Sequence, residues 1–350
     1  MTLTRLLASG LALACAAPAL AAETSFEWRA VGQAAGSYAT DPPPRADRWD
    51  AFAGYGVTGD FAVTSDSGLK VGLTATVGSG DYEKSLDRPG NNEKLTLSEV
   101  FLDVTSAYGR VKLGDEDGAA KRAVDLLPIL VGGQMDGFWT RMPGARPPQY
   151  HLGRDSDDAT KILYETPRLA GARAGLSYAP ERDSLVEDIK KASLLPAEED
   201  FWELGLNYRG DAGAWSYELA AGYGRGQSDT PGIADTESVK LAGLLLYGGF
   251  SFGALWYDDG DSGRPTGRFD TSGYTLQGTY ENGPYGATLF WHDSEAEGLA
   301  DYRAYGLGLS WRARETLTFG LDLVRVDNDL ATPARGQDGW VGTLVAEVRF

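Results

Sequence analysis

Apolar and polar side chains alternate along most of this chain after roughly the first twenty residues. The clearest segment is 201–209, where Trp202, Leu204, Leu206 and Tyr208 are separated by glutamate, glycine and asparagine. Successive side chains of a β-strand point to opposite faces, so this pattern predicts a strand with one apolar and one polar face. Similar segments recur to the end of the chain, and the pattern therefore predicts an all-β fold.

The last eleven residues, 340–350, carry the same pattern with an aromatic side chain at each end. The even positions from Trp340 to Phe350 are apolar or small, and Glu347 and Arg349 belong to the other set. In a tilted strand these two aromatic ends would lie roughly 25 Å apart along a membrane normal, the spacing of the aromatic girdles of a membrane barrel. The segment also resembles the C-terminal signature of bacterial outer-membrane proteins, which end in phenylalanine. The alternative is a half-buried strand that closes a soluble β-domain.

The aromatic side chains favour the membrane interpretation. In most of the alternating segments the apolar face begins or ends with tryptophan or tyrosine, as suits a lipid–water boundary.

The fourth segment is the least regular, because its alternation slips between Leu97 and Val100, which suggests a β-bulge. The pattern predicts sixteen strands, near residues 25–38, 49–63, 68–79, 93–105, 109–115, 159–166, 171–179, 200–209, 213–225, 236–247, 250–258, 269–281, 284–293, 301–312, 315–326 and 338–350.

The connections between these segments alternate between long and short. Tight turns such as 65–67 and 282–283 alternate with longer loops such as 80–92 and 294–300. Short turns at one end and long loops at the other are typical of an outer-membrane barrel, and an even strand count places both termini at the short-turn end. The sequence therefore predicts one antiparallel transmembrane β-barrel domain over residues 22–350.

The N-terminus predicts export. Arg5 precedes a short apolar segment and an Ala-x-Ala motif, so residues 1–21 are expected to be a cleaved signal peptide. Cys15, the single cysteine of the chain, lies within it, and lipoprotein processing at Cys15 is the less favoured alternative. The mature chain then has no disulfide to hold it together and must rely on another device, such as a closed hydrogen-bonded barrel.

The charge of the chain is strongly acidic. There are 32 basic and 50 acidic residues, and removal of Arg5 leaves 31 basic residues and a net charge of −19. This balance excludes nucleic acid as a favoured partner, because nucleic acid binding needs a cationic surface. It fits a water-filled lumen that prefers cations.

The longest connection, residues 116–158, is the candidate functional segment, since a loop of this length in a compact domain is usually functional or disordered. It contains acidic side chains together with two apolar clusters, 124–131 and 135–139. The apolar clusters should not remain in water, so we expect the loop to pack against another surface, such as the inner wall of the barrel.

Three short motifs resemble the general porins of alphaproteobacteria (the Rhodobacter-type family). Residues 108–120 (YGRVKLGDEDGAA) resemble the segment that enters the third loop, and 161–167 (KILYETP) with 175–180 (GLSYAP) resemble the strands that follow it. The resemblance implies a sixteen-stranded barrel, a homotrimer, and a third loop that folds inward to narrow the pore. It also implies that acidic groups on the loop face basic groups on the wall. The loop acids that match are Asp115, Glu116, Asp117, Asp125 and Asp136, and the wall candidates by strand parity are Arg29 and Lys70.

Enzymatic and metal chemistry have little support in the sequence. His292, Asp293 and Ser294 are adjacent, but a catalytic triad assembles in space and not along the chain. Residues 258–261 (DDGD) offer oxygen ligands without the full calcium-loop pattern. A solvated acidic loop is the favoured interpretation, and a weak Ca²⁺ site or a divalent bridge to lipopolysaccharide is the alternative. We therefore expect no enzyme activity, no catalytic residues, no dedicated metal site and no cofactor.

These observations predict an outer-membrane general diffusion porin of a Gram-negative cell. It would pass ions and small hydrophilic solutes through a water-filled, cation-preferring pore, with outer-membrane lipid and lipopolysaccharide around it. A substrate-selective channel is the alternative within transport. A non-transporting barrel, such as an adhesin or a lipid-modifying enzyme, is the alternative from another class.

Overall fold

The computed structural model describes residues 22–79, 95–147, 151–183, 198–330 and 336–350. The predicted signal peptide, 1–21, lies outside these residues, as does most of the predicted loops 80–92 and 180–199. Among the described residues, no helix is both long enough and apolar enough to cross a membrane.

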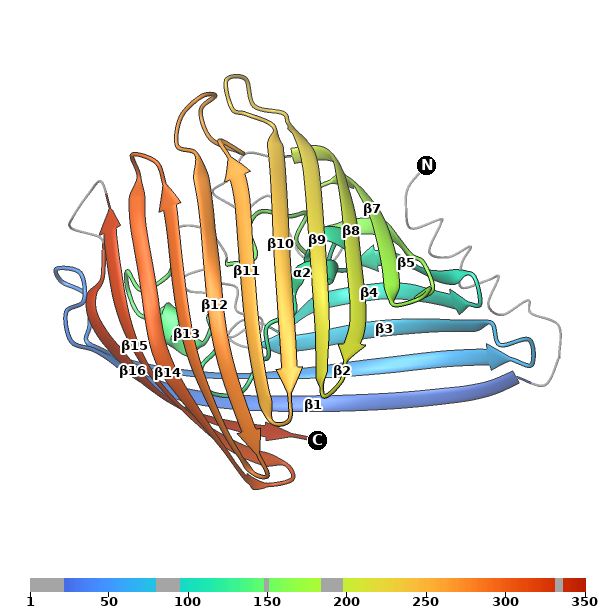
Figure 1. The fold of residues 1–350 in the computed structure, drawn as a ribbon, viewed down its shortest axis with the longest axis horizontal. Helices are drawn as coiled ribbons and strands as arrows, with labels where there is room; N and C mark the ends of the chain where they lie inside the picture. Colours follow the sequence, from blue (N-terminus) through green and yellow to red (C-terminus); the bar gives the residue numbers. More distant parts are fainter. Residues whose placement is uncertain (1–21, 80–94, 148–150, 184–197, 331–335) are drawn as a thin grey trace.

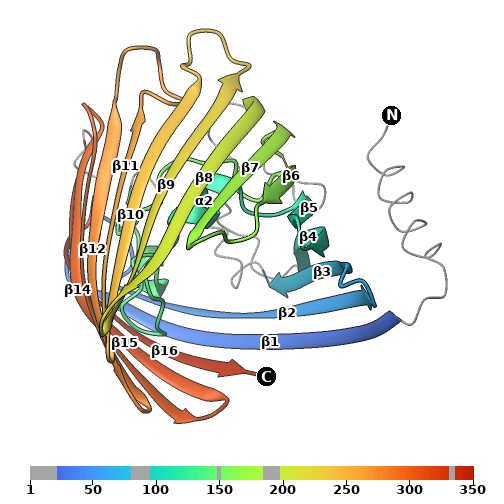
Figure 2. The same cartoon turned by 45° about the vertical axis from the view of Figure 1, so that its right-hand side comes forward.

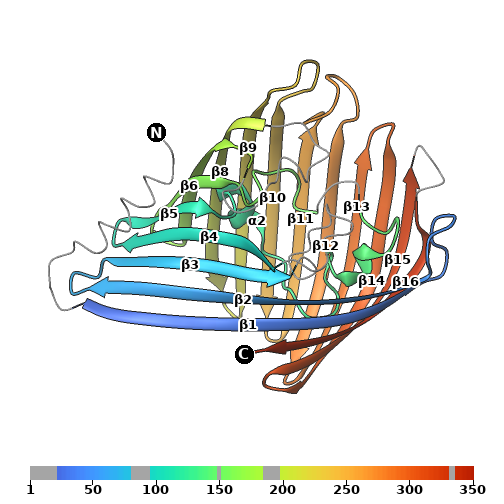
Figure 3. The same cartoon turned by 180° about the vertical axis from the view of Figure 1, so that it is seen from behind.

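All sixteen strands belong to one closed antiparallel barrel in which each strand pairs with its neighbours in the sequence and β1 pairs with β16. The prediction of a sixteen-stranded barrel is confirmed. Figures 1 and 3 show the walls formed by β8–β15 and by β1–β4 crossing at a steep angle, as the tilted front and back of a barrel must. The strands are β1 (Ala22–Ala39), β2 (Trp49–Ser65), β3 (Lys70–Ser79), β4 (Leu95–Ser106), β5 (Gly109–Asp115), β6 (Thr160–Glu165), β7 (Ala172–Glu181), β8 (Glu198–Ala212), β9 (Trp215–Ser228), β10 (Thr236–Tyr247), β11 (Phe250–Gly260), β12 (Thr271–Asn282), β13 (Tyr285–Ala296), β14 (Ala300–Arg314), β15 (Leu317–Leu330) and β16 (Asp338–Arg349).

The barrel closes between the two ends of the described chain. The Ala30 amide donates to the Phe350 carbonyl at 3.0 Å, and the Phe350 amide donates back to Ala30 at 2.9 Å. On the lumen side of this seam, Gln33 of β1 donates to the Glu347 carboxylate of β16 at 2.7 Å. Glu347, in the polar set of the last strand, therefore lies on the inner face.

The predicted irregularity of the fourth strand is present. Thr76 of β3 pairs with Glu99 of β4, but the next residue, Val77, pairs with Leu97. Ser98 is therefore the extra residue of a β-bulge, which reverses the parity of β4 at the place where the sequence alternation slips.

The outer face of the barrel is apolar and the inner face is polar, as the alternation predicts. On β8, Trp202 and Leu206 are each 49% exposed on the outer face, whereas Glu203 is 1% exposed on the inner face. Apolar side chains with this degree of exposure form the surface that a bilayer covers.

Aromatic side chains form two rows on the outer face. The row at the short-turn end includes the contacts Trp215–Tyr247, Phe250–Tyr280 and Trp311–Phe319, with ring centroids 4.5, 4.4 and 5.8 Å apart. The row at the long-loop end includes Tyr38–Trp49, Tyr178–Trp202 and Trp291–Tyr305, at 4.6, 4.4 and 5.0 Å. Together they are the two girdles of a membrane barrel.

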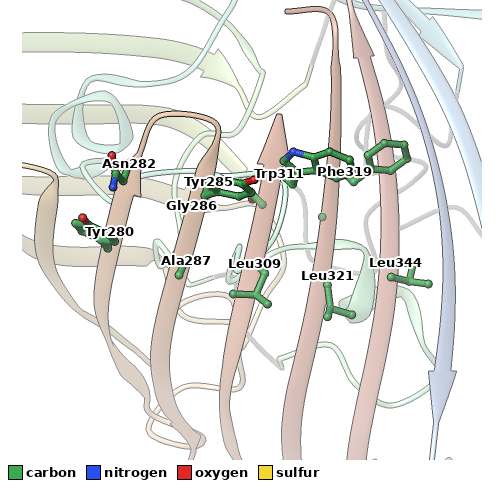
Figure 4. Close-up of a pocket in the computed structure, with 12 residues that line it drawn as sticks. Tyr280, Asn282, Tyr285, Gly286, Ala287, Leu309, Trp311, Phe319, Leu321 and Leu344 are labelled. Carbon is green, nitrogen blue, oxygen red and sulfur yellow. The ribbon is translucent and has the colours of Figure 1, made fainter. Parts of the chain in front are cut away.

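A shallow hollow of about 410 Å³ lies within the first of these rows. Figure 4 shows Tyr285, Trp311 and Phe319 side by side, with Ala287, Leu309 and Leu321 further along the same strands. This hollow opens on the apolar outer face, so it belongs to the membrane-facing surface and not to the lumen.

Candidate functional site: the long loop inside the barrel

The connection between β5 and β6 lies inside the barrel. It contains two short helices, α2 (Ala119–Val124) and η1 (Phe138–Arg141). Figure 2 shows α2 in the space between the β7–β9 wall and the β1–β3 wall. The predicted inward fold of this long third loop, residues 116–158, is confirmed, and we call it the inner loop.

The first limb of the inner loop packs against glycines of the wall. Helix α2 is built largely from small residues, and its buried side faces Gly175 of β7, Gly205 of β8 and Gly222 of β9. A Cβ atom on Gly205 would lie 2.1 Å from the Ala119 carbonyl oxygen, closer than any van der Waals contact allows. The wall is therefore glycine here because the loop backbone touches the strand backbone.

The loop then reaches β14 and β15. A Cβ on Gly308 of β14 would lie 1.9 Å from the Gly133 nitrogen, so the two backbones are again in contact. The Gly132 amide donates to the Ser310 hydroxyl at 2.9 Å, and the Gly133 amide donates to the Asp322 carboxylate at 2.5 Å. Inward-facing polar side chains of the wall thus satisfy the loop backbone.

Apolar side chains fix the middle part of the inner loop, around η1, to the barrel wall. Trp139 is fully buried, and its ring stacks on Phe290 of β13 with centroids 5.9 Å apart. Phe138 stacks on Phe52 of β2 at 6.2 Å, and the Arg141 guanidinium lies 4.9 Å from the centre of the Phe52 ring. The predicted burial of the apolar cluster 135–139 is confirmed. The buried cluster consists of Ala39, Met135, Trp139, Met142, Ala145, Phe290, Tyr302, Ala304, Val324, Val326 and Val341.

Ion pairs hold the returning limb of the inner loop. Arg154 lies 3.0 Å from the Glu198 carboxylate, with side chains only 3% and 1% exposed, and its backbone amide donates to Asp259 at 2.9 Å. Lys240 of β10 lies 3.5 Å from the Asp155 carboxylate. Charges this deeply buried are tolerated because each has a partner of opposite sign.

The Asp155 carboxyl is stabilised in its charged form. Its burial by itself would raise the pKa, but the positive charges of Lys240, Lys121 and Arg182 outweigh burial and hold the pKa well below its usual range. Asp155 therefore stays ionised in the folded loop at neutral pH.

Two of the predicted loop acids are buried at the entrance of the loop. Asp115 is fully buried and accepts a hydrogen bond from Thr160. Glu116 is 3% exposed and is bound by Lys112 and by Arg122, the latter at 2.7 Å. These two carboxylates join the loop to β5, β6 and α2.

The other three predicted acids are more accessible. Asp117 is paired with Lys121 at 2.5 Å, and its side chain is 33% exposed. Asp125 is exposed and Asp136 is half-buried, and both line one hollow together with His151 and Gln277. The structure therefore brings Asp125 and Asp136 together and separates them from the acids at the loop entrance.

The two wall candidates lie on the inner face near the short-turn end. Arg29 of β1 pairs with Asp60 of β2 at 2.7 Å. Lys70 lines a hollow of about 520 Å³ together with Asp60, Asp103 and Arg173. Lys70 thus faces the mouth at the short-turn end, and neither residue pairs with a described loop acid.

Other basic residues of the inner wall were not selected from the sequence. Arg110 of β5, Arg173 of β7 and Arg209 of β8 all face the lumen. Strand parity could have identified them, since each stands in the polar set of its strand. Arg168 lies in the turn between β6 and β7, where parity gives no information, and its guanidinium donates to Asn207 on the inner face at 2.6 Å.

The adjacent residues His292, Asp293 and Ser294 do not form a triad. His292 is fully buried on the inner face and contacts the Thr275 hydroxyl at 2.9 Å, while Asp293 pairs with Arg303 at 2.8 Å. Alternation along β13 places the middle residue on the opposite face of the wall.

The acids of segment 258–261 also diverge. Asp259 is buried and accepts from Ser238 at 2.6 Å, whereas Asp258 is exposed and accepts from the Gly260 amide at 3.0 Å. Across the described residues, no three histidine, cysteine, aspartate or glutamate side chains are grouped as a metal ion would require.

Comparison with known proteins agrees with the barrel fold. A mutant of the Rh. blastica porin superposes with a TM-score of 0.62 at 16% identity, over 93% of this chain and 100% of the other. A triple mutant of the Rhodopseudomonas blastica porin gives 0.59 at 16% identity, with the same coverage. At this identity the likeness establishes the fold. No curated protein sequence matches the chain. The family model described as Gram-negative porin matches residues 8–338, and the chain therefore belongs to the Gram-negative porin family.

Proposed function

We propose that this chain is a general diffusion porin of the outer membrane, which passes ions and small hydrophilic solutes passively. The observation that carries the proposal is the exposure of charged side chains on the inner wall. Arg29 and Arg209 face away from the apolar outer surface, yet their side chains are 59% and 61% exposed. A solvent-accessible charged inner face behind an apolar outer face is the property of a water-filled channel.

We propose further that the channel prefers cations. The mature chain would carry 31 basic and 50 acidic residues, a net charge of −19. Of the loop acids, Asp125 and Asp136 are the best placed to act on passing ions, because they are accessible and line the same hollow. Asp117 can contribute more weakly, since Lys121 neutralises part of its field.

Planar-bilayer recording tests both parts of this proposal. The folded protein should give large ohmic steps and, under a potassium chloride gradient, a reversal potential of the sign that cation preference requires. Folded protein without conductance would favour a non-transporting barrel, and current blocked by one solute class would favour a substrate-selective channel.

Two double variants test whether the acids of the inner loop produce the cation preference. Asp125→Asn with Asp136→Asn should move the reversal potential toward zero. Glu295→Gln with Asp301→Asn is the matched control, because these exposed acids are cross-strand neighbours on the outer face at the long-loop rim. Equal shifts in both double variants would assign the preference to overall charge and not to the inner loop.

We propose a homotrimer as the assembled form, with its interface on the outer face of β1, β2 and β16. Small residues meet there in register, since Ala34 pairs with Ala53 on one side and Ala346 on the other. A Cβ added to Gly32 or Gly36 would meet nothing within 4 Å. A flat outer face of this kind suits close contact with a second barrel wall better than contact with loose lipid chains.

The remaining parts of the proposal concern export and surroundings. Residues 1–21 would direct export and be removed, and the outer girdles would contact lipid and lipopolysaccharide. Transport along fixed charges needs no cofactor and no enzymatic step. A weak Ca²⁺ contact of lipopolysaccharide phosphate with the exposed Asp258 and the half-buried Asp261 is compatible with this arrangement.

A further inference from the structure

A group of arginines stands at the short-turn mouth of the lumen, opposite in sign to the chain as a whole. Arg173 of β7, Arg209 of β8 and Arg168 of the β6–β7 turn all lie near one residue of β8, Asn207. Arg173 is the cross-strand partner of Asn207, Arg209 lies two residues further on the same face, and Arg168 donates to the Asn207 oxygen at 2.6 Å. Cross-strand and same-face neighbours of this kind lie within reach of one another's long side chains.

The arginine group is rigid at one end. The Arg168 guanidinium is fixed twice, by the Gly171 carbonyl at 2.7 Å and by Asn207. Asn207 is itself held by its amide, which donates to Glu218 at 2.5 Å. Because Arg168 bends over the turn toward the inner face, its charge is presented to the lumen and not to lipid headgroups.

Most acids near this group are already paired with other basic side chains. Glu218 pairs with Arg209 at 2.6 Å, which leaves the three arginines and one carboxylate with a net charge of +2. Four more acids line the same hollow as Arg173, and three of them already have a basic partner. Glu165 pairs with Arg122 of α2 at 3.3 Å, Asp60 pairs with Arg29 at 2.7 Å, and Asp103 pairs with Arg110; Glu27 is the fourth. In the described part of the chain, Arg173 has no hydrogen bond or ion pair, and its side chain is exposed along the hollow of about 520 Å³.

Arg168 lies close enough to Arg209 and Arg173 for their positive charges to act on it. Burial and the positive charges of Arg209 and Arg173 lower the pKa of the Arg168 guanidinium. Arginine remains protonated in spite of this, so the group stores a repulsion that a bound anion would relieve.

We propose that Arg168, Arg173 and Arg209 form a binding site for small oxyanions, phosphate above all, at the short-turn mouth of the lumen. Guanidinium groups bind phosphate and carboxylate oxygens with paired, charge-assisted hydrogen bonds. A dianion would balance the net charge of the group, and Arg173 and Arg209 are exposed enough to reach it. The site lies at the short-turn mouth of the proposed cation-preferring channel. Anions would bind there, while cations are favoured elsewhere in the lumen.

Phosphate binding can be measured without conduction, so this proposal and the proposed channel can fail separately. The probe is inorganic phosphate, and the measurement is the phosphorus NMR linewidth of phosphate titrated with the folded barrel in phosphate-free detergent. Replacing each arginine by glutamine should weaken binding about two- to fivefold, the effect of one exposed ion pair. The triple variant R168Q/R173Q/R209Q should abolish the broadening.

Two further variants make the test decisive. Arg312→Gln removes a lumen-facing arginine of β14, which lines a different hollow near the short-turn end, and should leave phosphate binding unchanged. Arg173→Lys should retain binding better than R173Q, and both can be made even if the triple variant does not fold. Absence of broadening with the wild-type barrel, or an equal loss in R312Q, would overturn the proposal.

Discussion

At the scale of single residues, the inner loop depends on glycines of the barrel wall, which leave room for the loop backbone. Gly205 and Gly308 lie on the inner face of β8 and β14, and each touches the loop backbone where a methyl group would not fit. Other glycines of the barrel have no such role, because Gly36 and Gly342 have open space around the position of a Cβ. Glycine therefore makes room for the inner loop at some positions of the sheet and has no such contact at others.

Alanine substitutions distinguish these two groups of glycines. Gly205→Ala and Gly308→Ala should each displace the inner loop and lower the free energy of unfolding by about 1–3 kcal/mol, the usual cost of overpacking. Gly342→Ala should be neutral. Thermal unfolding followed by tryptophan fluorescence, together with single-channel conductance, measures both effects. Equal behaviour of all three variants would show that the loop does not press on the wall.

Of the five predicted loop acids, Asp115 is the last residue of β5 and the other four lie in the inner loop, but the sequence did not show what each one does. Glu116 and Asp125 look alike in the sequence, yet Glu116 is bound by Lys112 and Arg122 while Asp125 is exposed. The difference arises from partners on β5 and α2 that meet only after folding. Spacing along the chain carries no information about such pairings. Strand parity, in contrast, could have identified Arg110, Arg173 and Arg209, because each stands in the polar set of its strand.

At the scale of elements, the inner loop is held in two different ways. The first limb, around α2, is fixed by close packing on glycine, and the returning limb is fixed by buried ion pairs. Packing resists small displacements, whereas buried charges are costly to separate because the partner is left without compensation. The two limbs should therefore respond to different perturbations.

Breaking one buried pair should loosen the returning limb. Arg154→Met leaves the Glu198 carboxylate buried near Arg182 alone and should cost about 3–5 kcal/mol of folding free energy. Arg303→Met removes an exposed pair with Asp293 on the outer face and should cost less than about 1 kcal/mol. Chemical unfolding in detergent compares the two variants. A similar small cost for both would mean that the returning limb contributes little to stability.

Acid should also release the returning limb. The pKa of Asp155 is lowered in the folded state, so its contribution to stability is complete above the usual aspartate pKa of about 4 and is lost as pH falls toward the lowered value. Current noise should therefore stay low down to about pH 4 and increase below it. Asp155→Asn, which cannot ionise, should be noisier at neutral pH and should lose this dependence.

The strands were predictable to within a few residues, including the slip in β4, because alternation and turn residues are local signals. The path of the inner loop could not be predicted from the sequence. Its contacts join residues such as Gly133 and Asp322 that are far apart in the sequence, and only the closed barrel brings them together.

At the scale of the whole molecule, the outer surface is not uniform. Large apolar side chains such as Leu276 occupy the middle of the outer face on β8–β15, whereas alanine and glycine occupy much of the middle of β1, β2 and β16, between aromatic residues such as Trp28 and Tyr38. The register of the strands places the small residues of β1, β2 and β16 on one continuous outer face. The trimer itself remains a prediction.

A protruding side chain tests that surface. Ala34→Trp should reduce the fraction of trimer, because the indole would occupy space that the second wall needs. Leu276→Trp is the matched control, since Leu276 is 51% exposed among the lipid-facing residues of β12. Native mass spectrometry of both variants and the wild type gives the oligomeric state. If A34W forms as much trimer as the L276W control, the trimer interface does not include Ala34.

The hydrogen bonds between Ala30 and Phe350 set a limit on the timing of assembly. β1 is made first and β16 last, so the first strand must wait for the last before its free edge is paired. Until then the growing sheet presents two unpaired edges, which are templates for association with other chains. A cell that makes this protein must therefore keep the unfinished chain apart from its neighbours until translation and transport to the membrane are complete.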